Sequence, residues 1–219
     1  MQWNPLPIPD QQLAEQLQTE IGVPFEISCL LAQRGIQDYE MAKSFFRPAL
    51  SDLHDPFLML GMREAVNRIK SSLESGEKIM VFGDYDVDGT TAVALVYSFL
   101  IQEHPNCFYY IPDRYQEGYG ISTQGIDHAK IEEVGLIIAL DCGIKAVEKV
   151  DYAQSLGIDF IICDHHLPGE IIPNAAAVLD PKQPNCSYPF KDLCGCGIGF
   201  KLIQALTQEK GGAIHDIIP

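Results

Sequence analysis

Short apolar runs alternate with segments of helical periodicity over most of this 219-residue chain, from residue 63 to residue 206. Runs of about four apolar residues bounded by turn-forming residues are typical of buried strands, and apolar residues spaced three or four apart are typical of helices. The expected strands are 79–82, 107–111, 136–140, 160–163 and 177–179, and the expected helices are 63–73, 90–102, 126–133, 145–156 and 197–206. This alternation predicts an α/β fold, with a mostly parallel sheet flanked by helices.

The first 60 residues have a different pattern. Apolar residues at helical spacing predict three helices, at 11–21, 26–34 and 38–46, and Pro48 ends the last of them. An irregular connector then leads to the alternating region. We therefore expect an N-terminal helical cap with its connector over residues 1–60, and the α/β domain over residues 61–219.

The composition is that of an ordinary globular protein, with 47% hydrophobic and 21% charged residues. No apolar run approaches the ~20 residues of a membrane span, and the N-terminus lacks the basic and apolar regions of a signal peptide. These features favour the cytoplasm and argue against a membrane partner. The net charge of −15 argues against a nucleic-acid partner. However, acidic residues that bind divalent cations become part of a locally positive site.

The sequence GDYDVDG, at residues 83–89, places three aspartates at alternate positions before a glycine. This arrangement matches the first half of an EF-hand calcium loop. The twelfth position of that loop would be Leu95, which offers no carboxylate, and an apolar strand rather than a helix precedes the motif. We therefore reject the calcium loop. A turn that merely caps the next helix needs only one aspartate. Three aspartates this close would repel one another and raise one another's pKa unless a cation were bound.

Two further expected strands end in acidic residues or histidines. Asp141 follows the third strand, and Asp164-His165-His166 follows the fourth. The carboxyl ends of parallel strands share one edge of the sheet, where α/β folds bind their ligands. Carboxylates and imidazoles without a thiolate suit Mn²⁺ or Mg²⁺, and a shared carboxylate gives a two-metal site like those of phosphatases and nucleases. The pattern predicts metal-assisted phosphoester chemistry.

The glycine-rich sequence GCGIGF, at residues 195–200, opens the last expected helix. Its backbone amides could meet a phosphate, or its glycines could allow the start of the helix to pack closely, and the sequence leaves both interpretations open. The chain contains neither a P-loop sequence nor G-x-S-x-G.

Three motifs together resemble the DHH phosphoesterase superfamily: residues 83–89, Asp141-Cys142-Gly143 and Asp164-His165-His166. The stretches IPDRYQEGYGIS, at residues 111–122, and YPFKDLCGCGIGFKL, at residues 188–202, resemble its single-strand-specific exonucleases. The resemblance implies an enzyme that degrades single-stranded DNA in the 5′-to-3′ direction, depends on two Mn²⁺ or Mg²⁺ ions, and acts with other proteins in DNA repair and recombination.

The resemblance also implies roles for individual residues. Asp86 and Asp88 would each hold one metal, Asp141 would bridge the two ions, and His165 would be an imidazole ligand. Asp84 would lie beside the metals as a further candidate ligand.

Three more roles concern the substrate and the supporting residues. His166 would contact the scissile phosphate, Asp164 would orient His165, and Arg114 would hold a DNA phosphate. An ion pair between Arg114 and Glu117 is the alternative for that arginine. Phe82 stands where relatives have a histidine, so fewer protein groups would hold the first metal.

The C-terminus departs from the family pattern. GAIHDIIP, at the chain end, resembles the fourth motif and makes Asp216 a candidate metal ligand, with Asp180 as the alternative. The DHH-associated domain of the relatives is absent from this sequence, so the activity of the chain alone is expected to be low. Two other functions stay open: a phosphodiesterase for short oligonucleotides or cyclic dinucleotides, and a catalytically silent binding module.

Overall fold

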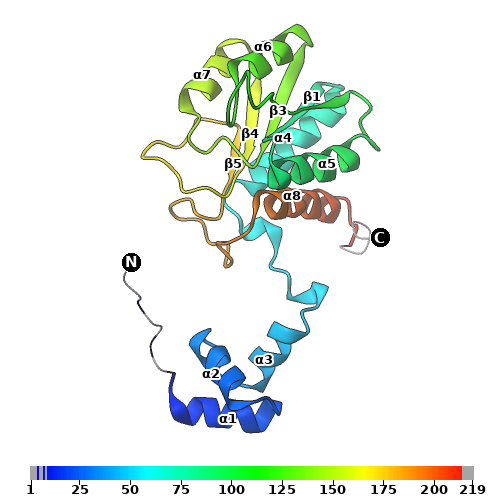
Figure 1. Cartoon of the computed structure of the whole chain (residues 1–219). Helices are drawn as coiled ribbons and strands as arrows, with labels where there is room; N and C mark the ends of the chain where they lie inside the picture. Colours follow the sequence, from blue (N-terminus) through cyan, green and yellow to red (C-terminus); the bar gives the residue numbers. More distant parts are fainter. Residues whose placement is uncertain (1–3, 5–6, 8, 214–219) are drawn as a thin grey trace. The chain divides into compact units, whose positions relative to one another are not determined.

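The computed structural model describes residues 4, 7 and 9–213. The chain forms two compact units, Met1–Leu53 and His54–Pro219 (Figure 1). The division lies before His54 because the connector packs with the second unit: Lys201 Nζ donates a hydrogen bond to the His54 carbonyl at 2.8 Å. The sequence pattern placed the boundary seven residues later, at 60/61.

The described residues of the first unit form three helices, α1 (Gln11–Ile21), α2 (Phe25–Gln33) and α3 (Tyr39–Phe46), followed by a 3₁₀ turn, η1 (Leu50–Asp52). Asp10 caps α1 by accepting from the Gln12 amide, and Asp38 caps α3 by accepting from the Met41 amide. The core of this unit is small and consists of Leu17, Leu31, Ile36 and Ala42, with partly buried neighbours.

The second unit is built on a five-stranded sheet in which every pairing is parallel. Its strands lie in the order β2-β1-β3-β4-β5. Their bounds are β1 Lys78–Gly83, β2 Cys107–Tyr110, β3 Val134–Leu140, β4 Asp159–Cys163 and β5 Ala177–Leu179. The predicted α/β fold with a parallel sheet is confirmed, and each expected strand is present to within two residues.

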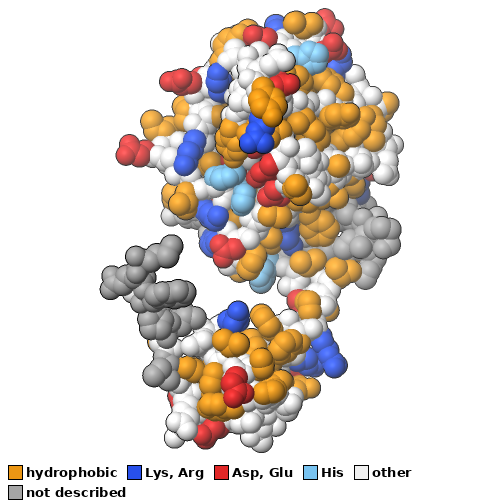
Figure 2. All heavy atoms as spheres, viewed as in Figure 1, with side chains coloured by type: hydrophobic (Ala, Val, Ile, Leu, Met, Phe, Trp, Pro, Cys, Tyr) orange, Lys and Arg blue, Asp and Glu red, His pale blue; other side chains and the backbone are white. Residues whose placement is uncertain are grey.

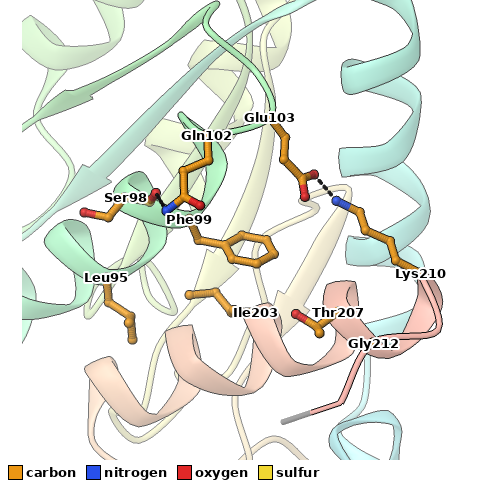
Figure 3. A pocket seen from close by; sticks show the side chains of 9 residues that line it. All are labelled: Leu95, Ser98, Phe99, Gln102, Glu103, Ile203, Thr207, Lys210 and Gly212. Atoms are coloured by element: carbon orange, nitrogen blue, oxygen red, sulfur yellow. Dashed lines mark hydrogen bonds and ion pairs between the residues drawn. The ribbon is translucent and has the colours of Figure 1, made fainter. Parts of the chain in front are cut away.

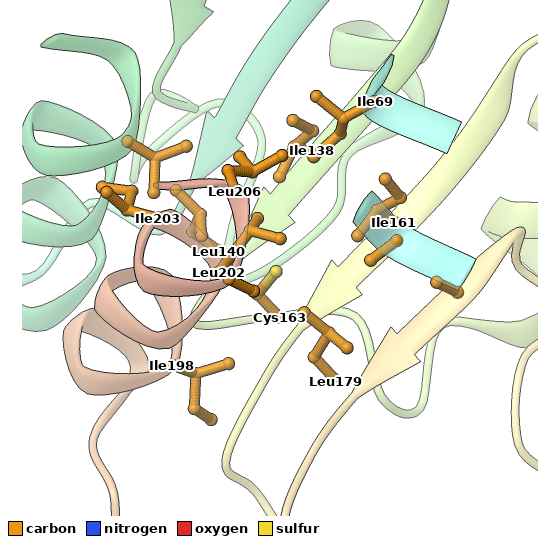
Figure 4. Close-up of a cluster of buried hydrophobic side chains, with 14 of the residues drawn as sticks. Ile69, Ile138, Leu140, Ile161, Cys163, Leu179, Ile198, Leu202, Ile203 and Leu206 are labelled. Atoms are coloured by element: carbon orange, nitrogen blue, oxygen red, sulfur yellow. The ribbon is translucent and has the colours of Figure 1, made fainter. Parts of the chain in front are cut away.

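Helices cover both faces of this sheet (Figure 1). On one face lie α4 (Met62–Ser75), α5 (Val87–Leu100) and α8 (Gly195–Glu209), beside the short turn η2 (Pro56–Leu58), and on the other lie α6 (Thr123–Ile131) and α7 (Val147–Ser155). Alternate strand residues supply the two cores, as the twofold repeat of a strand requires. Ile138 and Leu140 face α8 (Figure 4), whereas Ile137 and Ala139 face the opposite side.

The helices α5 and α8 pack against each other along the sheet, and both begin at its carboxyl edge. Between their C-terminal halves lies a cavity of about 370 Å³, lined in part by Phe99, Ile203 and Thr207 (Figure 3). Glu103 and Lys210 form an ion pair beside it. This cavity lies at the helix ends opposite to those that reach the carboxyl edge. Among the residues described, no helix is long and apolar enough to cross a membrane.

Candidate metal centre

The turn after β1 brings three aspartates to the carboxyl edge of the sheet in three different environments. Asp84 is fully buried; one oxygen accepts from the Tyr85 amide at 2.8 Å, and the other has no hydrogen-bond partner within the described part of the chain. Burial, followed by the charge of Asp86, raises the pKa of the Asp84 carboxyl. Asp86 is exposed and caps α5 through one oxygen, which accepts from the Gly89 amide at 2.9 Å. Helix capping therefore explains only one of the three aspartates, Asp86.

Asp88 joins this turn to the glycine-rich start of α8. Its two oxygens accept hydrogen bonds from the Gly195 and Cys196 amides at 2.7 and 2.8 Å. The free amides at a helix N-terminus favour a negative charge. The start of α8 is therefore engaged by a carboxylate of this chain. This result decides between the two interpretations of GCGIGF, because the glycines let α8 approach the acidic turn.

Asp141 follows β3 and is almost completely buried, with 2% of its surface exposed. Its φ of 61° lies in the left-handed region, which aspartate tolerates better than most residues. Burial, followed by the charges of Asp88 and Asp86, raises the pKa of its carboxyl to about 7. A Cβ atom at position 195 would lie only 2.6 Å from the Asp141 Cβ, so the first residue of α8 must be glycine.

The two histidines follow β4 and take up different positions. His165 directs Nε2 towards two carboxylates, with Asp141 Oδ1 at 3.1 Å and Asp88 Oδ2 at 3.7 Å. His166 is held by Asp164, whose Oδ1 lies 2.7 Å from its Nδ1. The resemblance implied that Asp164 orients His165, and the structure differs: Asp164 accepts from the His165 backbone amide, while the imidazole that it contacts is that of His166.

Two groups of possible metal ligands meet at Asp141. One contains Asp84, Asp86 and Asp141, and the other contains Asp141, His165 and His166; within each group the ligand atoms lie within 4.8 Å of one another. Asp141 Oδ1 is buried; His165 Nε2 lies 3.1 Å from it, but the geometry of that contact is not that of a hydrogen bond. A cluster of buried, partly unpartnered carboxylate oxygens beside imidazole nitrogens fits divalent cations such as Mn²⁺ and Mg²⁺.

Two of the described candidate ligands lie outside these groups: Asp88, whose oxygens are bonded to α8, and Asp180. Asp180 follows β5, is fully buried, and accepts from the Lys182 amide at 2.7 Å; burial raises the pKa of its carboxyl to about 6. It belongs to neither ligand group. Asp216 lies outside the described residues.

An aromatic chain that the sequence analysis missed connects Arg114 with His166. The Arg114 guanidinium carbon lies 5.3 Å from the centre of the Tyr85 ring. Tyr85 contacts Tyr119 edge to face, and the Tyr119 hydroxyl lies 3.3 Å from His166 Nε2. Glu117 instead accepts from the Tyr110 hydroxyl and the Asp113 amide. The available sequence signal was the position of Tyr119 between two glycines.

Comparisons with known proteins agree with this arrangement. Residues 78–218 match the DHH family, N-terminal domain. The chain is 40% identical to the single-stranded-DNA-specific exonuclease RecJ of Bacillus subtilis over all of its length, and 36% identical to RecJ of Escherichia coli over 81%. It spans 29% and 30% of the lengths of those proteins.

Solved structures of RecJ have the same fold. A manganese-bound exonuclease RecJ is 31% identical with a TM-score of 0.62, and covers 70% of this chain and 39% of its own. RecJ of Thermus thermophilus in complex with Mn²⁺ is 26% identical with a TM-score of 0.74, and covers 94% of this chain and 28% of its own. With the family match extending over more than half of its residues, this chain belongs to the DHH family.

Proposed function

We propose that this chain carries the metal-dependent catalytic centre of a single-stranded-DNA exonuclease of the RecJ type. The observation that carries the proposal is the environment of Asp141, a buried carboxylate shared by two groups of possible ligands. Burying an ion without a compensating charge is costly. Two cations beside Asp141 would compensate the cost of burying its negative charge. They would also favour the ionised form of its carboxyl, whose pKa is raised to about 7.

The ligands follow from the two groups. Asp84 and Asp86 would hold one ion together with Asp141, and His165 with Asp141 would hold the other. Asp88 would join them, because its carboxylate has lone pairs beyond those bonded to α8 and lies 3.7 Å from His165 Nε2. Asp216 stays a candidate for the second ion. Mn²⁺ and Mg²⁺, the ions named for the T. thermophilus RecJ complexes, suit this set of oxygen and imidazole donors.

The reaction proposed is hydrolysis of a phosphodiester. When bound, the two ions supply an activated water and neutralise charge on the phosphoryl group. His166 is fixed through Nδ1 by Asp164, and its Nε2 faces the Tyr119 hydroxyl, so its imidazole is held in a constant orientation from which it can contact a phosphate oxygen. Arg114 is exposed and ion-paired with no described acidic residue, which leaves its guanidinium available for a second phosphate.

The substrate assignment rests on the relatives. All the RecJ proteins matched carry the name single-stranded-DNA-specific exonuclease, and the same specificity is proposed here. The 5′-to-3′ direction, a role in repair and recombination with protein partners, and a cytoplasmic location belong to the same proposal. The acidic net charge means that DNA is held by local groups such as Arg114 rather than by a broad basic surface.

A nuclease assay tests the proposal. A 5′-phosphorylated, 3′-labelled single strand is incubated with the chain and Mn²⁺, beside a duplex of the same sequence and a cyclic dinucleotide. We expect shortening from the 5′ end of the single strand, no cleavage in EDTA, and no cleavage by Asp141→Asn. Asp151→Asn, an exposed aspartate on α7, is the matched control. Preferential cleavage of the cyclic dinucleotide would favour the alternative phosphodiesterase, and no cleavage of any substrate would favour the silent module.

A further inference from the structure

The segment between β2 and α6 carries two side chains that lie near the metal centre. It comprises residues 111–122, forms neither a helix nor a strand, and is called here the β2–α6 loop. Arg114 and Tyr119 lie on it, and both are exposed. Figure 2 shows histidine, acidic and basic side chains close together on the visible face of the second unit. A loop without regular backbone hydrogen bonds needs other contacts to hold such side chains in place.

Glu117 joins the two ends of the β2–α6 loop to each other. Its Oε1 accepts from the Asp113 amide at 2.8 Å, and its own amide donates to the Asp113 carbonyl at 2.9 Å. Its Oε2 accepts from the Tyr110 hydroxyl at 2.9 Å and from the Ser122 hydroxyl. Tyr110 is the last residue of β2, and Ser122 caps α6 by accepting from the Gly125 amide at 2.9 Å. One carboxylate therefore connects the end of a strand, the start of a helix and the loop between them.

The contacts of Glu117 also explain why Arg114 is unpaired. The two residues are three positions apart in the sequence, and an ion pair between them was the alternative interpretation of that arginine. In the structure, three uncharged donors occupy the oxygens of Glu117, and neither residue has an ion pair with any described residue. The Arg114 guanidinium lies beside the Tyr85 ring instead. Glu117 therefore shapes the loop without neutralising its cation.

The position of Tyr119 also depends on how the loop ends are held. Tyr119 lies between Gly118 and Gly120, whose φ angles of 82° and 77° fall in the left-handed region that glycine adopts readily. Glycines on both sides give this part of the chain backbone freedom that other contacts must restrict. The Tyr119 ring contacts Tyr85 edge to face, and its hydroxyl lies 3.3 Å from His166 Nε2.

We propose that Glu117 is a positioning residue, which holds Arg114 and Tyr119 beside the metal centre by joining the ends of the β2–α6 loop. It acts through hydrogen bonds rather than charge, because its three side-chain partners are neutral. A glutamine side chain has the same length, and a hydroxyl group can both donate and accept. Glu117→Gln should therefore keep most of these contacts, whereas Glu117→Ala removes them. The inference rests on the proposed function in assigning Arg114 and Tyr119 to the substrate.

A double-mutant cycle on the full chain tests this role. Fluorescence anisotropy measures affinity for a labelled single strand in Mn²⁺, with phosphorothioate linkages that resist cleavage. Glu117→Ala should bind about fivefold more weakly, by misplacing one charged contact, and Glu117→Gln should bind within about twofold of the unaltered chain. In the Arg114→Ala background, Glu117→Ala should cost about twofold or less, because the residue through which it acts is gone. Glu148→Ala, an exposed glutamate of α7, is the matched control.

Hydrogen–deuterium exchange tests the loop without DNA. Amides of residues 113–122 should exchange about tenfold faster in Glu117→Ala, while sheet amides and Mn²⁺ affinity stay unchanged. Tyr110→Phe removes one donor, keeps the ring that stacks on Phe82, and should give a smaller change in the same direction.

The outcomes separate this inference from the proposed function. If the unaltered chain does not bind the single strand, the proposed substrate is wrong, and exchange in the loop still decides whether Glu117 holds it. Unchanged exchange in Glu117→Ala, or an equal loss of DNA affinity with and without Arg114, would overturn the positioning role. Faster exchange of the sheet amides as well would show that Glu117 supports the whole fold, and would also overturn it.

Discussion

The two edges of the sheet in the second unit differ in how their clustered carboxylates are balanced. At the amino edge, Arg68 binds Glu77 through two nitrogens, at 2.7 and 3.0 Å, and also binds Asp159 at 2.7 Å. At the carboxyl edge, Asp84 and Asp141 each have a buried oxygen without a hydrogen-bond partner among the residues described. Both edges gather carboxylates. Arg68 is the cation at the amino edge, whereas among the residues described neither Asp84 nor Asp141 forms an ion pair with a lysine or an arginine, and Asp141 has only the imidazole of His165 beside it.

The carboxyl pKa values at the two edges are shifted in opposite directions. Hydrogen bonding to Arg68 lowers the pKa of the Glu77 carboxyl. Burial and neighbouring aspartates raise the pKa of the Asp141 carboxyl to about 7. Paired carboxylates stabilise a fold, whereas unpaired ones with raised pKa values mark a functional site. We therefore assign a stabilising role to the amino edge and the binding of an external cation to the carboxyl edge.

The largest expected effect is on metal binding at the carboxyl edge. Replacing Asp141 with alanine removes the one carboxylate shared by both ligand groups, so Mn²⁺ affinity should fall at least ~100-fold. Isothermal titration with Mn²⁺ measures this change. Asp151→Ala, an exposed aspartate of α7, should titrate like the unaltered chain. Unchanged Mn²⁺ affinity in Asp141→Ala would remove Asp141 from the centre.

The next effect concerns stability at the amino edge. Arg68→Ala leaves Glu77 and Asp159 without their cation and should lower the free energy of unfolding by about 2 kcal/mol, less than for a fully buried pair because both carboxylates are partly exposed. Urea unfolding measures it, and Mn²⁺ affinity should stay unchanged. Lys70→Ala, beside Glu209 at 3.8 Å, should change stability by less than ~0.5 kcal/mol. A loss of Mn²⁺ binding in Arg68→Ala would show that the two edges are not independent.

The sequence predicted which residues lie at the carboxyl edge, but it did not predict how their side chains contact one another. The alternation of strands and helices determined the sheet, and three strand ends with acidic residues indicated where ligands gather. It could not show that Asp164 contacts the imidazole of His166, because two adjacent histidines are equivalent candidates in a sequence. It also could not show that α8 binds Asp88, because those groups lie 107 residues apart in the chain.

A smaller effect is expected on substrate binding at the carboxyl edge, with metal binding unchanged. Arg114→Ala removes an exposed cation beside Tyr85, so affinity for single-stranded DNA should fall about fivefold to tenfold, the loss expected for one charged contact. The dependence of DNA binding on salt should also become shallower, by about one unit or less of slope. Filter binding over a range of salt concentrations measures both, with Lys70→Ala as the control. If Mn²⁺ affinity falls while DNA affinity is kept, Arg114 does not hold phosphate.

The smallest expected effect is the pH dependence of the metal-free chain, where the two edges should have opposite signs. The Glu77 pKa is lowered on folding, so its contribution is present above the usual value of 4.5 and is lost as pH falls. The Asp141 pKa is raised, so its folded state holds a proton that the unfolded state has released. Its contribution is therefore present below pH 3.8 and is lost as pH rises towards about 7. In EDTA, the free energy of urea unfolding should fall from pH 4 to pH 7, and this fall should be shallower in Asp141→Asn. An equal dependence on pH in that variant would show that Asp141 does not cause the fall.

The stability of the unaltered chain and of Asp141→Asn at pH 8, measured by urea unfolding with EDTA and with Mn²⁺, tests whether the carboxyl edge depends on an external cation. Without metal, asparagine removes a buried charge that its neighbours repel, so the variant should be the more stable of the two. With Mn²⁺, binding to the folded state stabilises the chain that keeps its ligand, so the order should reverse. If Asp141→Asn is the less stable in both conditions by the same amount, Asp141 has a structural role and the carboxyl edge does not depend on an external cation.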